Sequence, residues 1–275
     1  MEIWDSYNNQ LIKQNTDLVR GQPIPDGLYH IVVEVIVLHI DGDYLAMQRA
    51  YTKSKFPGAF EISAGGSLLK GENPLEGIQR ELLEETGILC YDFKQIYTEV
   101  NDNQHTIYIG YICNVDCDKN SIKLQDGETI SYKWINHDEA LDFIRSNNYV
   151  TLHRIRIEPY IYRIELENYL DKEVTVFVDR PLGLPHPKHN DIIYSVNYGY
   201  INELVAPDGE EQDAYILGVS VPLKTFSGKV AAIIRRNNDT EDKLVVAPHN
   251  INLTETEIIE QTHFQEQYFD IEIIK

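Results

Sequence analysis

The chain has 275 residues and a formal charge of −20, from 24 Lys and Arg against 44 Asp and Glu. A composition of 43% hydrophobic and 25% charged residues is typical of a globular protein and excludes a disordered or collagen-like chain. The acidic surface predicts no binding to nucleic acid or anionic membranes, whereas small phosphorylated ligands are compatible with it because bound divalent cations reverse the local charge. At roughly 150 residues per domain, the length predicts two domains.

The N-terminal segment MEIWDSYNNQ has neither the basic flank nor the apolar core of a signal peptide. The apolar run at residues 31–40 is interrupted by Glu34 and His39 and is too short to span a membrane. We therefore expect a soluble cytoplasmic protein. The cysteines are odd in number, lack the spacing of a zinc site and are interpreted as reduced thiols: Cys90, Cys113 and Cys117.

Residues 29–40 form a continuous apolar and β-branched run, which is typical of a buried strand. The turn expected at residues 41–43, Asp-Gly-Asp, returns the chain as a second strand over residues 44–49. A short strand is expected near Phe60–Ile62, followed by the Ala-Gly-Gly sequence of residues 64–66. These elements lead into a helix with clear start and stop signals.

That helix begins after Asn73, whose side chain can cap it, with Pro74 at the first position and Glu76 completing a capping box. Gly87 suits the left-handed residue that ends a helix. The apolar side chains expected to share the face that reaches the core are Leu75, Ile78 and Leu82.

Further strands are expected near residues 93–100, 105–115 and 129–135, and further helices over residues 137–146 and 151–167. Pro159 is expected to break or kink the last of these helices. Strands mixed with helices indicate an α/β domain, which we assign to residues 1–170.

After residue 172 the sequence changes to short strand candidates separated by Pro, Gly, Asp and Asn. The candidates are residues 174–178, 192–201, 213–221, 229–236 and 243–248. This pattern predicts a small, mainly-β barrel or sandwich over residues 171–275. A terminal helix is expected from Glu255 to about Tyr268, with Thr254 and Glu257 as its capping box.

Three glutamates of the first predicted helix have the spacing i, i+3 and i+4 and therefore share one face: Glu81, Glu84 and Glu85. Carboxylates clustered after a glycine-rich turn suit the hard cations Mg²⁺ and Mn²⁺. Arg80 can pair with a neighbouring carboxylate and fix its direction. The same pattern also fits a solvated acidic helix face, because exposed charges are tolerated there.

Gly66, Glu72 and the run RELLEETGI at residues 80–88 resemble the Nudix box in every fixed position. The resemblance covers roughly residues 30–145 and implies the Nudix α/β/α sandwich and hydrolysis of a diphosphate linked to another group. Isopentenyl diphosphate isomerase has the same fold but a box that departs from this pattern, and its proton shuttle resembles a cysteine–glutamate pair. Here the box is complete and Cys90 follows the helix, so isomerase is the alternative.

The resemblance implies metal binding by the three box glutamates, an interaction of Glu72 with Arg80, and close approach of the diphosphate to Gly65 and Gly66. It leaves the general base open between a box glutamate and Glu128. The catalytic residues that it implies are Arg80, Glu84, Glu85 and Glu128.

Two acidic segments of the second half, residues 208–213 and 239–243, accompany a set of tyrosines. Such acids could hold several divalent ions, and Lys243 and tyrosine hydroxyls could hold phosphate oxygens. Ordinary acidic turns between strands are the alternative, because Asp and Gly favour turns.

The segments NYGYI, DGEEQDAYIL, EDKLVVAP and HFQEQY, in this order within residues 173–270, resemble a short family I soluble inorganic pyrophosphatase. The resemblance implies a β-barrel of the oligonucleotide-fold type with metal ions in its mouth. The metal ligands that it implies are Asp208, Glu210 and Asp213, with an ambiguous alignment of Asp239 and Asp242. The phosphate-binding residues that it implies are Tyr194, Tyr198, Lys243 and Tyr268.

The domain departs from that family in length and in charge. A hairpin that carries a lysine and an arginine is absent or collapsed into Leu184–Asp191, Glu210 replaces an aspartate, and Phe269 replaces a lysine. Each lost cation removes charge-assisted contacts of about 1.5–3 kcal/mol from a phosphate site. A non-catalytic module for phosphate binding, packing, dimerisation or ligand sensing is therefore the alternative.

The sequence as a whole predicts a two-domain, Mg²⁺-dependent hydrolase in which Mn²⁺ can substitute. The expected ligands are a small organic diphosphate, inorganic diphosphate and, for the module, a second copy of the chain. If the first domain releases inorganic diphosphate, its hydrolysis by the second draws the first reaction forward by mass action. The identity of the organic substrate is left open.

Overall fold

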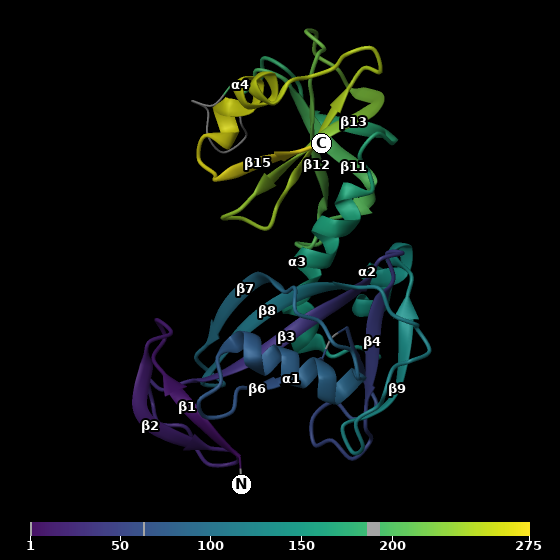
Figure 1. The fold of residues 1–275 in the computed structure, drawn as a ribbon. Helices are drawn as coiled ribbons and strands as arrows, with labels where there is room; N and C mark the ends of the chain where they lie inside the picture. The colour runs from purple at the N-terminus through teal and green to yellow at the C-terminus, as the bar shows by residue number, and fades with distance from the viewer. Residues whose placement is uncertain (1, 63, 186–192) are drawn as a thin grey trace. The chain divides into compact units, whose positions relative to one another are not determined.

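The computed structural model describes residues 2–62, 64–185 and 193–275. The chain divides into two compact units, Met1–Arg156 and Ile157–Lys275 (Figure 1). The division falls inside helix α3 (Thr151–Glu167), so this helix contributes residues to both units. The boundary predicted at residue 170 lies beyond the helix and stays a prediction.

The first unit is built on a mixed β-sheet in which the described strands have the order β5-β4-β3-β8-β7, with β6 paired to β3 and β9 to β4. These strands are β3 (His30–His39), β4 (Tyr44–Arg49), β5 (Phe60–Glu61), β6 (Ala64–Ser67), β7 (Lys94–Asn101), β8 (Thr106–Val115) and β9 (Thr129–Ile135). The central pair, β3 and β8, is parallel over its whole length. The strands predicted for this half of the chain are confirmed.

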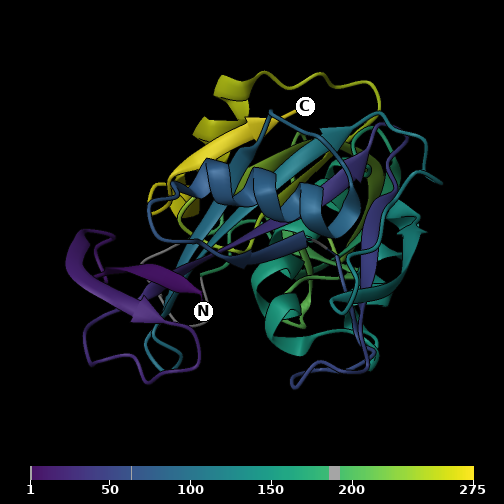
Figure 2. The same ribbon diagram turned by 60° about the horizontal axis from the view of Figure 1, so that its bottom comes forward.

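Helix α1 (Pro74–Thr86) covers one face of this sheet (Figures 1 and 2). The predicted capping box is present, because the Asn73 side chain accepts the N–H of Glu76 while the Glu76 carboxylate accepts the N–H of Asn73. Gly87 ends the helix with φ +74°. Ile78 and Leu82 are buried against β3 and β8, and burial of such side chains stabilises the unit by about 1.5–3 kcal/mol each.

One expectation for the helices is wrong, and a second, of a break or kink at Pro159, is wrong as to the break. Leu75 is 49% exposed, because Leu68 occupies the space beneath the first turn, where a Cβ on Gly77 would overlap it. Pro159 does not break α3, which is continuous. The proline removes one hydrogen bond to the carbonyl of Ile155, and the exposed position of Ile155 lets water satisfy that carbonyl. The predicted helix before it, α2 (His137–Arg145), is confirmed.

An antiparallel hairpin, β1 (Ile3–Tyr7) and β2 (Lys13–Val19), precedes the sheet, in a segment for which the sequence predicted no element. Two backbone hydrogen bonds of 2.9 Å join Tyr7 to Tyr29, directly before β3. The hairpin therefore stands beside the end of the sheet at which β3 begins (Figures 1 and 2).

Five described strands of the second unit close into a barrel, in the order β10-β11-β12-β14-β13 and back to β10. They are β10 (Glu173–Arg180), β11 (Asn197–Val205), β12 (Glu211–Ile216), β13 (Thr225–Arg236) and β14 (Lys243–Ala247). Strands β12 and β14 are parallel, and β15 (Ile271–Ile274) extends the sheet beside β13. This closure agrees with a barrel, one of the two architectures predicted for residues 171–275, whereas a barrel of the pyrophosphatase type stays a prediction. The strand expected from residue 192 begins at Asn197.

Helix α4 (Glu255–Glu266) has the predicted capping box of Thr254 and Glu257 and ends before Tyr268. The barrel core contains three fully buried tyrosines: Tyr194, Tyr198 and Tyr215. The expected collapsed hairpin at Leu184–Asp191 falls mostly outside the described residues. Among the helices that the structure describes, none has both the length and the apolar character needed to cross a membrane.

Candidate functional site

Strand β6 and helix α1 bring the glycines and the glutamates of the box together. A Cβ on Gly66 would overlap the carboxylate of Glu81, so a larger residue at this position would require the Glu81 side chain to shift. The Gly65 N–H donates to Glu85 Oε2 at 3.3 Å. The close approach expected at these two glycines is therefore made by carboxylates of α1, and approach of a diphosphate stays a prediction.

Arg80 is held by one carboxylate and in turn holds two others. Its Nε and Nη2 atoms donate to Glu72 at 2.7 and 2.9 Å, and this bidentate pairing lowers the pKa of Glu72. Its Nη1 atom lies 2.8 Å from Glu81 and 3.2 Å from Glu84. The implied interaction of Glu72 with Arg80 is present, and the arginine fixes the direction of two box glutamates.

Glu85 is the least compensated carboxylate of the box. Desolvation raises its pKa well above the usual range, and the negative charges of Glu61 and Glu81 raise it further. Desolvation also raises the pKa of Glu81, against the opposing effect of Arg80. Neighbouring oxygen donors that resist ionisation fit a hard divalent cation, which would stabilise their charged forms.

A pocket of about 550 Å³ lies at these glutamates. Its wall includes Glu128, which forms an ion pair with Lys53. Arg49 and Lys55 line it as well, and Arg49 is paired with Glu61 at 2.8 Å. Our sequence analysis missed these cations, although their close spacing between β4 and β5 in an acidic chain is a usable signal. Three side chains of the hairpin also line the pocket: Glu2, Trp4 and Arg20.

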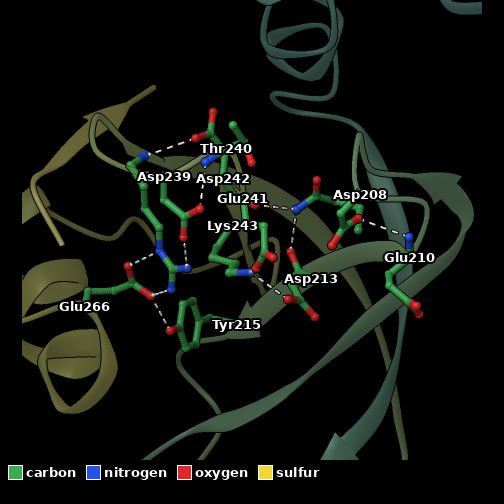
Figure 3. Close-up of polar contacts among 12 residues, drawn as sticks. Asp208, Glu210, Asp213, Tyr215, Asp239, Thr240, Glu241, Asp242, Lys243 and Glu266 are labelled. Carbon is green, nitrogen blue, oxygen red and sulfur yellow. Dashed lines mark hydrogen bonds and ion pairs between the residues drawn. The ribbon is translucent and has the colours of Figure 1, made fainter. Parts of the chain in front are cut away.

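The barrel contains a second pocket, of about 580 Å³. Asp208, Glu210 and Asp213, from β12 and the loop before it, line this pocket (Figure 3). Lys243, almost fully buried at the start of β14, places its Nζ atom 2.6 Å from Asp213 and 3.0 Å from Glu241. An internal ammonium group therefore already compensates part of this acidic cluster.

Asp239 and Asp242, in the second acidic segment, form ion pairs with arginines. The buried Asp242 carboxylate lies 3.1 Å from Arg163 and accepts the backbone N–H of Arg236 at 3.1 Å. Asp239 pairs with the Arg236 side chain at 3.2 Å and stands across the cluster from Asp208 (Figure 3). Asp242 lines the same pocket as Asp208, Glu210 and Asp213, whereas Asp239 is not part of its described wall. Metal binding by Asp239 or Asp242 would compete with these ion pairs.

The four residues expected at phosphate are not equivalent in the structure. Tyr194 is buried in the barrel core, whereas Tyr198 is buried and also lines the pocket. Desolvation, with the charge of Asp213, raises the pKa of Tyr198 well above its usual range. Tyr268 is 64% exposed and is absent from the described wall of this pocket, and Lys243 is the ammonium group at Asp213.

Arg180 is a cation of the second pocket that our sequence analysis missed. Its Nη1 atom donates to the Tyr194 hydroxyl at 3.1 Å, and its guanidinium lies 5.1 Å from the centre of the Tyr198 ring. The strand alternation that buries Val176 places Arg180 on the same face of β10, and this signal was available in the sequence. The expected loss of cations from the barrel is therefore only partial.

Comparison with known proteins finds similarity in the first unit. Residues 28–155 match a family model described as NUDIX domain. A Listeria monocytogenes protein named an uncharacterized Nudix hydrolase is 34% identical over 89 residues, which are 32% of this chain and 53% of that protein. A Listeria innocua protein of the same description is 27% identical over 148 residues, 54% of this chain and 86% of that protein. The chain thus spans about half the length of the first of these relatives.

Two solved structures align with part of this chain. A Deinococcus radiodurans protein aligns with a TM-score of 0.47 and 19% identity over 59% of this chain and 98% of that chain. The NUDIX domain of Shewanella oneidensis NrtR, solved in complex with ADP ribose, aligns with a TM-score of 0.41 and 17% identity over 50% of this chain and 88% of that chain. The matched family segment ends at residue 155, before the barrel.

Proposed function

We propose that the first unit hydrolyses a diphosphate joined to a second organic group, because residues 28–155 match a family model described as NUDIX domain. The observation that carries this proposal is the clustering of Glu81, Glu84 and Glu85 beside the β6 glycines, in a pocket that also contains lysine and arginine side chains. Acidic and basic groups in one pocket suit a phosphorylated substrate that is bound partly through cations.

The proposed cofactor is Mg²⁺, with Mn²⁺ as a substitute, bound by the three box glutamates. The support is the hard oxygen donor set and the raised pKa of Glu81 and Glu85, since a divalent cation relieves the repulsion between these carboxylates. Such an ion, when bound, neutralises charge on phosphate oxygens and lowers the pKa of a bound water.

The protein's own side chains have separate roles in this proposal. Glu72 fixes Arg80, which keeps two box glutamates in position. Arg49 at the end of β4 and the two lysines of the following loop, Lys53 and Lys55, bind phosphate oxygens through charge-assisted hydrogen bonds. The proton of the attacking water passes to Glu85 or to Glu128, which both line the pocket.

A substrate screen with the full chain tests the proposal. Nucleoside triphosphates, sugar nucleotides, dinucleotides and inorganic diphosphate are each assayed with EDTA, Mg²⁺ or Mn²⁺. We expect metal-dependent cleavage of at least one organic diphosphate and none in EDTA. Absence of metal-dependent turnover across all classes, or turnover unaffected by EDTA, would contradict the proposal.

A second function is proposed for the barrel, namely binding of inorganic phosphate or diphosphate together with a divalent cation, and hydrolysis of diphosphate where catalysis is retained. The supporting observation is a pocket in which Asp208, Glu210 and Asp213 face Arg180 and Lys243. Thermal unfolding of the full chain with Mg²⁺, with and without diphosphate, tests this proposal. Stabilisation by diphosphate only with Mg²⁺, weakened in Asp213→Asn, supports it, whereas identical curves favour a packing or dimerisation module.

An isomerase acting on isopentenyl diphosphate remains the alternative for the first unit. That resemblance implies a cysteine in the proton shuttle, whereas Cys90, Cys113 and Cys117 are all absent from the described pocket wall. Product analysis with isopentenyl diphosphate distinguishes the two activities, since isomerisation releases no phosphate.

A further inference from the structure

The hairpin β1–β2 lies outside residues 28–155, yet it forms part of the same pocket. Its backbone is attached to the loop between β6 and α1, where the Lys70 N–H donates to Ile3 O at 2.9 Å and the Gly71 N–H donates to Asp5 Oδ2 at 2.8 Å. This loop carries the box, so the hairpin is fixed relative to the glutamates.

Trp4 contributes an aromatic side chain to the pocket wall, although the residue is only 8% exposed. Its ring stacks on His30, with ring centres 4.2 Å apart and an interplanar angle of 14°, and its Nε1–H donates to Glu2 at 2.6 Å. Burial lowers the pKa of His30 to about 4, so its imidazole is neutral at physiological pH. The imidazole is fixed by a 2.9 Å hydrogen bond with the Thr106 hydroxyl.

Arg20 stands where the hairpin meets the box. Its Nη1 atom donates to Glu2 at 2.6 Å, and this bond, with smaller effects of the charges of Glu128 and Glu81, raises its pKa. The side chain is 61% exposed. Because Glu2 balances its charge, the guanidinium offers directional hydrogen bonds and a planar face more than a net positive charge.

The β8 side of the pocket is also polar and uncharged. The Tyr108 hydroxyl donates to Gln104 Oε1 at 2.5 Å, which leaves the amide N–H groups of Gln104 as donors. Gln104, Thr106 and Tyr108 alternate along one face of the chain at β8 and line the pocket together. This side resembles the hairpin side in offering hydrogen bonds and aromatic surface without net charge.

The pocket wall therefore has two parts of different chemistry. The charged part consists of Arg49, Lys53, Lys55, Arg80, Glu81, Glu84, Glu85 and Glu128. The uncharged part consists of Trp4, His30, Gln104, Thr106 and Tyr108, with the compensated pair Glu2–Arg20 at its edge. A diphosphate with its cation matches the first part, and the rest of the substrate is then left to the second. The pocket volume lies within the roughly 300–1,000 Å³ of small-molecule sites.

We propose that the N-terminal hairpin is the specificity-determining wall of this pocket, and that Trp4 and Arg20 contact an uncharged, hydrogen-bonding ring attached to the diphosphate, a nucleobase or a sugar. The proposal rests on the proposed function of the same pocket. Glu2 acts as a positioning residue, since it binds both contact residues.

Binding of non-hydrolysable probes to the full chain tests the proposal without relying on turnover. The probes are α,β-methylene ADP and UDP, the α,β-methylene diphosphate of ribose, and methylenediphosphonate, which has no ring. Each is titrated in the presence of Mg²⁺ into wild type, Arg20→Gln and Lys13→Gln. Lys13 is the matched control, because it is an exposed hairpin cation paired with one carboxylate, Asp5, and is not part of the described pocket wall.

We expect Arg20→Gln to weaken binding of a ring-bearing probe at least about tenfold and to leave methylenediphosphonate within about twofold, as expected for loss of a charge-assisted contact to the ring alone. Lys13→Gln should change neither. Binding that is equally strong for ribose and nucleoside probes identifies the sugar as the ring, and stronger nucleoside binding identifies the base.

Fluorescence supplies a second measurement. The chain has two tryptophans, so in a Trp134→Phe background the emission reports Trp4. We expect ring-bearing probes to change this emission and methylenediphosphonate to leave it unchanged. The proposal is overturned if no ring-bearing probe binds, if Arg20→Gln behaves as Lys13→Gln does, or if it weakens the ringless probe equally. Failure of the proposed hydrolysis would instead appear as absent metal-dependent turnover with ring binding intact.

Discussion

Glu85 in the first pocket has carboxylates as charged neighbours, whereas Asp213 in the barrel pocket has an ammonium group. Desolvation and the charges of Glu61 and Glu81 raise the pKa of Glu85. In the barrel, Lys243 Nζ lies 2.6 Å from Asp213 Oδ2. We infer that Glu85 favours a cation from solution, whereas Asp213 already has one from the protein, although lysine and arginine side chains line both pockets.

The two pockets therefore illustrate two roles of buried charge, one functional and one structural. Uncompensated charge lowers stability and is concentrated at functional sites. Arg236 and Glu266 are a compensated buried pair, 2.6 Å apart. Such a pair matters for stability mainly because removing one partner leaves the other charge buried and unpaired. We infer that the first pocket is the stronger candidate for metal-dependent chemistry and that several barrel acids are structural.

The largest expected effect is on catalysis in the first pocket. Glu84→Gln and Glu85→Gln keep the shape but remove charge, so turnover of the best diphosphate substrate should fall at least about 100-fold, the scale of a lost transition-state interaction. Glu76→Gln on the same helix is the control, because glutamine can still complete the capping box. Near-wild-type turnover in both Glu84→Gln and Glu85→Gln would contradict the assignment of these glutamates to the catalytic site.

The next effect concerns the boundary between the units. Residues 157–167 of α3 belong to the barrel unit, where the Tyr162 hydroxyl donates to Gln212 at 2.8 Å and Ile161 is fully buried. A fragment of residues 151–275 should unfold cooperatively. A fragment of residues 171–275, cut at the predicted boundary, should lose at least about 3 kcal/mol from its lost apolar burial. Equal stability of the two in urea would show that α3 is dispensable to the barrel.

Breaking a compensated pair should destabilise the barrel. Glu266→Gln removes the bidentate carboxylate partner of the buried Arg236 guanidinium, which keeps its 3.2 Å pair with Asp239, and the free energy of unfolding should fall by about 3 kcal/mol. The exposed Glu260→Gln on the same helix is the matched control. Urea unfolding of the full chain, followed by circular dichroism, measures both, and indistinguishable midpoints would mean that the pair is not needed for stability.

The smallest expected effect is a gain in stability, whereas the changes above are losses. A carboxyl whose pKa is raised by folding stabilises the protein fully below its unfolded pKa, and this contribution is lost as the pH rises through the folded pKa. At pH 7.5 Glu85 therefore destabilises the metal-free protein. In EDTA, Glu85→Gln should raise the unfolding temperature by about 2–4 °C, and the difference should shrink at pH 4 and with Mg²⁺. A lower unfolding temperature for the variant in EDTA would contradict this electrostatic explanation.

The elements that the sequence predicted correctly are those whose start and stop signals lie within or next to the element itself. Asn73 and Gly87 mark the ends of α1 within the helix itself, and Thr254 with Glu257 does the same at the start of α4. The hairpin β1–β2 was missed because β2 is mostly polar and its attachment is distant in sequence. The hydrogen bond from Gly71 to Asp5, for example, joins residues 66 positions apart.

The same distinction explains the site predictions. Glu72 and Arg80 are eight residues apart on a turn and a helix, so their pairing follows from local spacing. Nothing near Asp242 in the sequence indicates a partner for its carboxylate, but Arg163, 79 residues earlier, donates a hydrogen bond to it. Only tertiary structure shows which acids are compensated, and that determines which of them can bind a metal.

Calorimetric titration of Mg²⁺ into the full chain, without phosphate ligands, tests the contrast between the pockets most directly. Wild type, Glu85→Gln and Asp213→Asn are compared under the same conditions. We predict that Glu85→Gln weakens Mg²⁺ binding at least about tenfold, because it removes a ligand charge from the uncompensated pocket, and that Asp213→Asn leaves binding unchanged. Binding retained in Glu85→Gln and lost in Asp213→Asn would contradict this prediction.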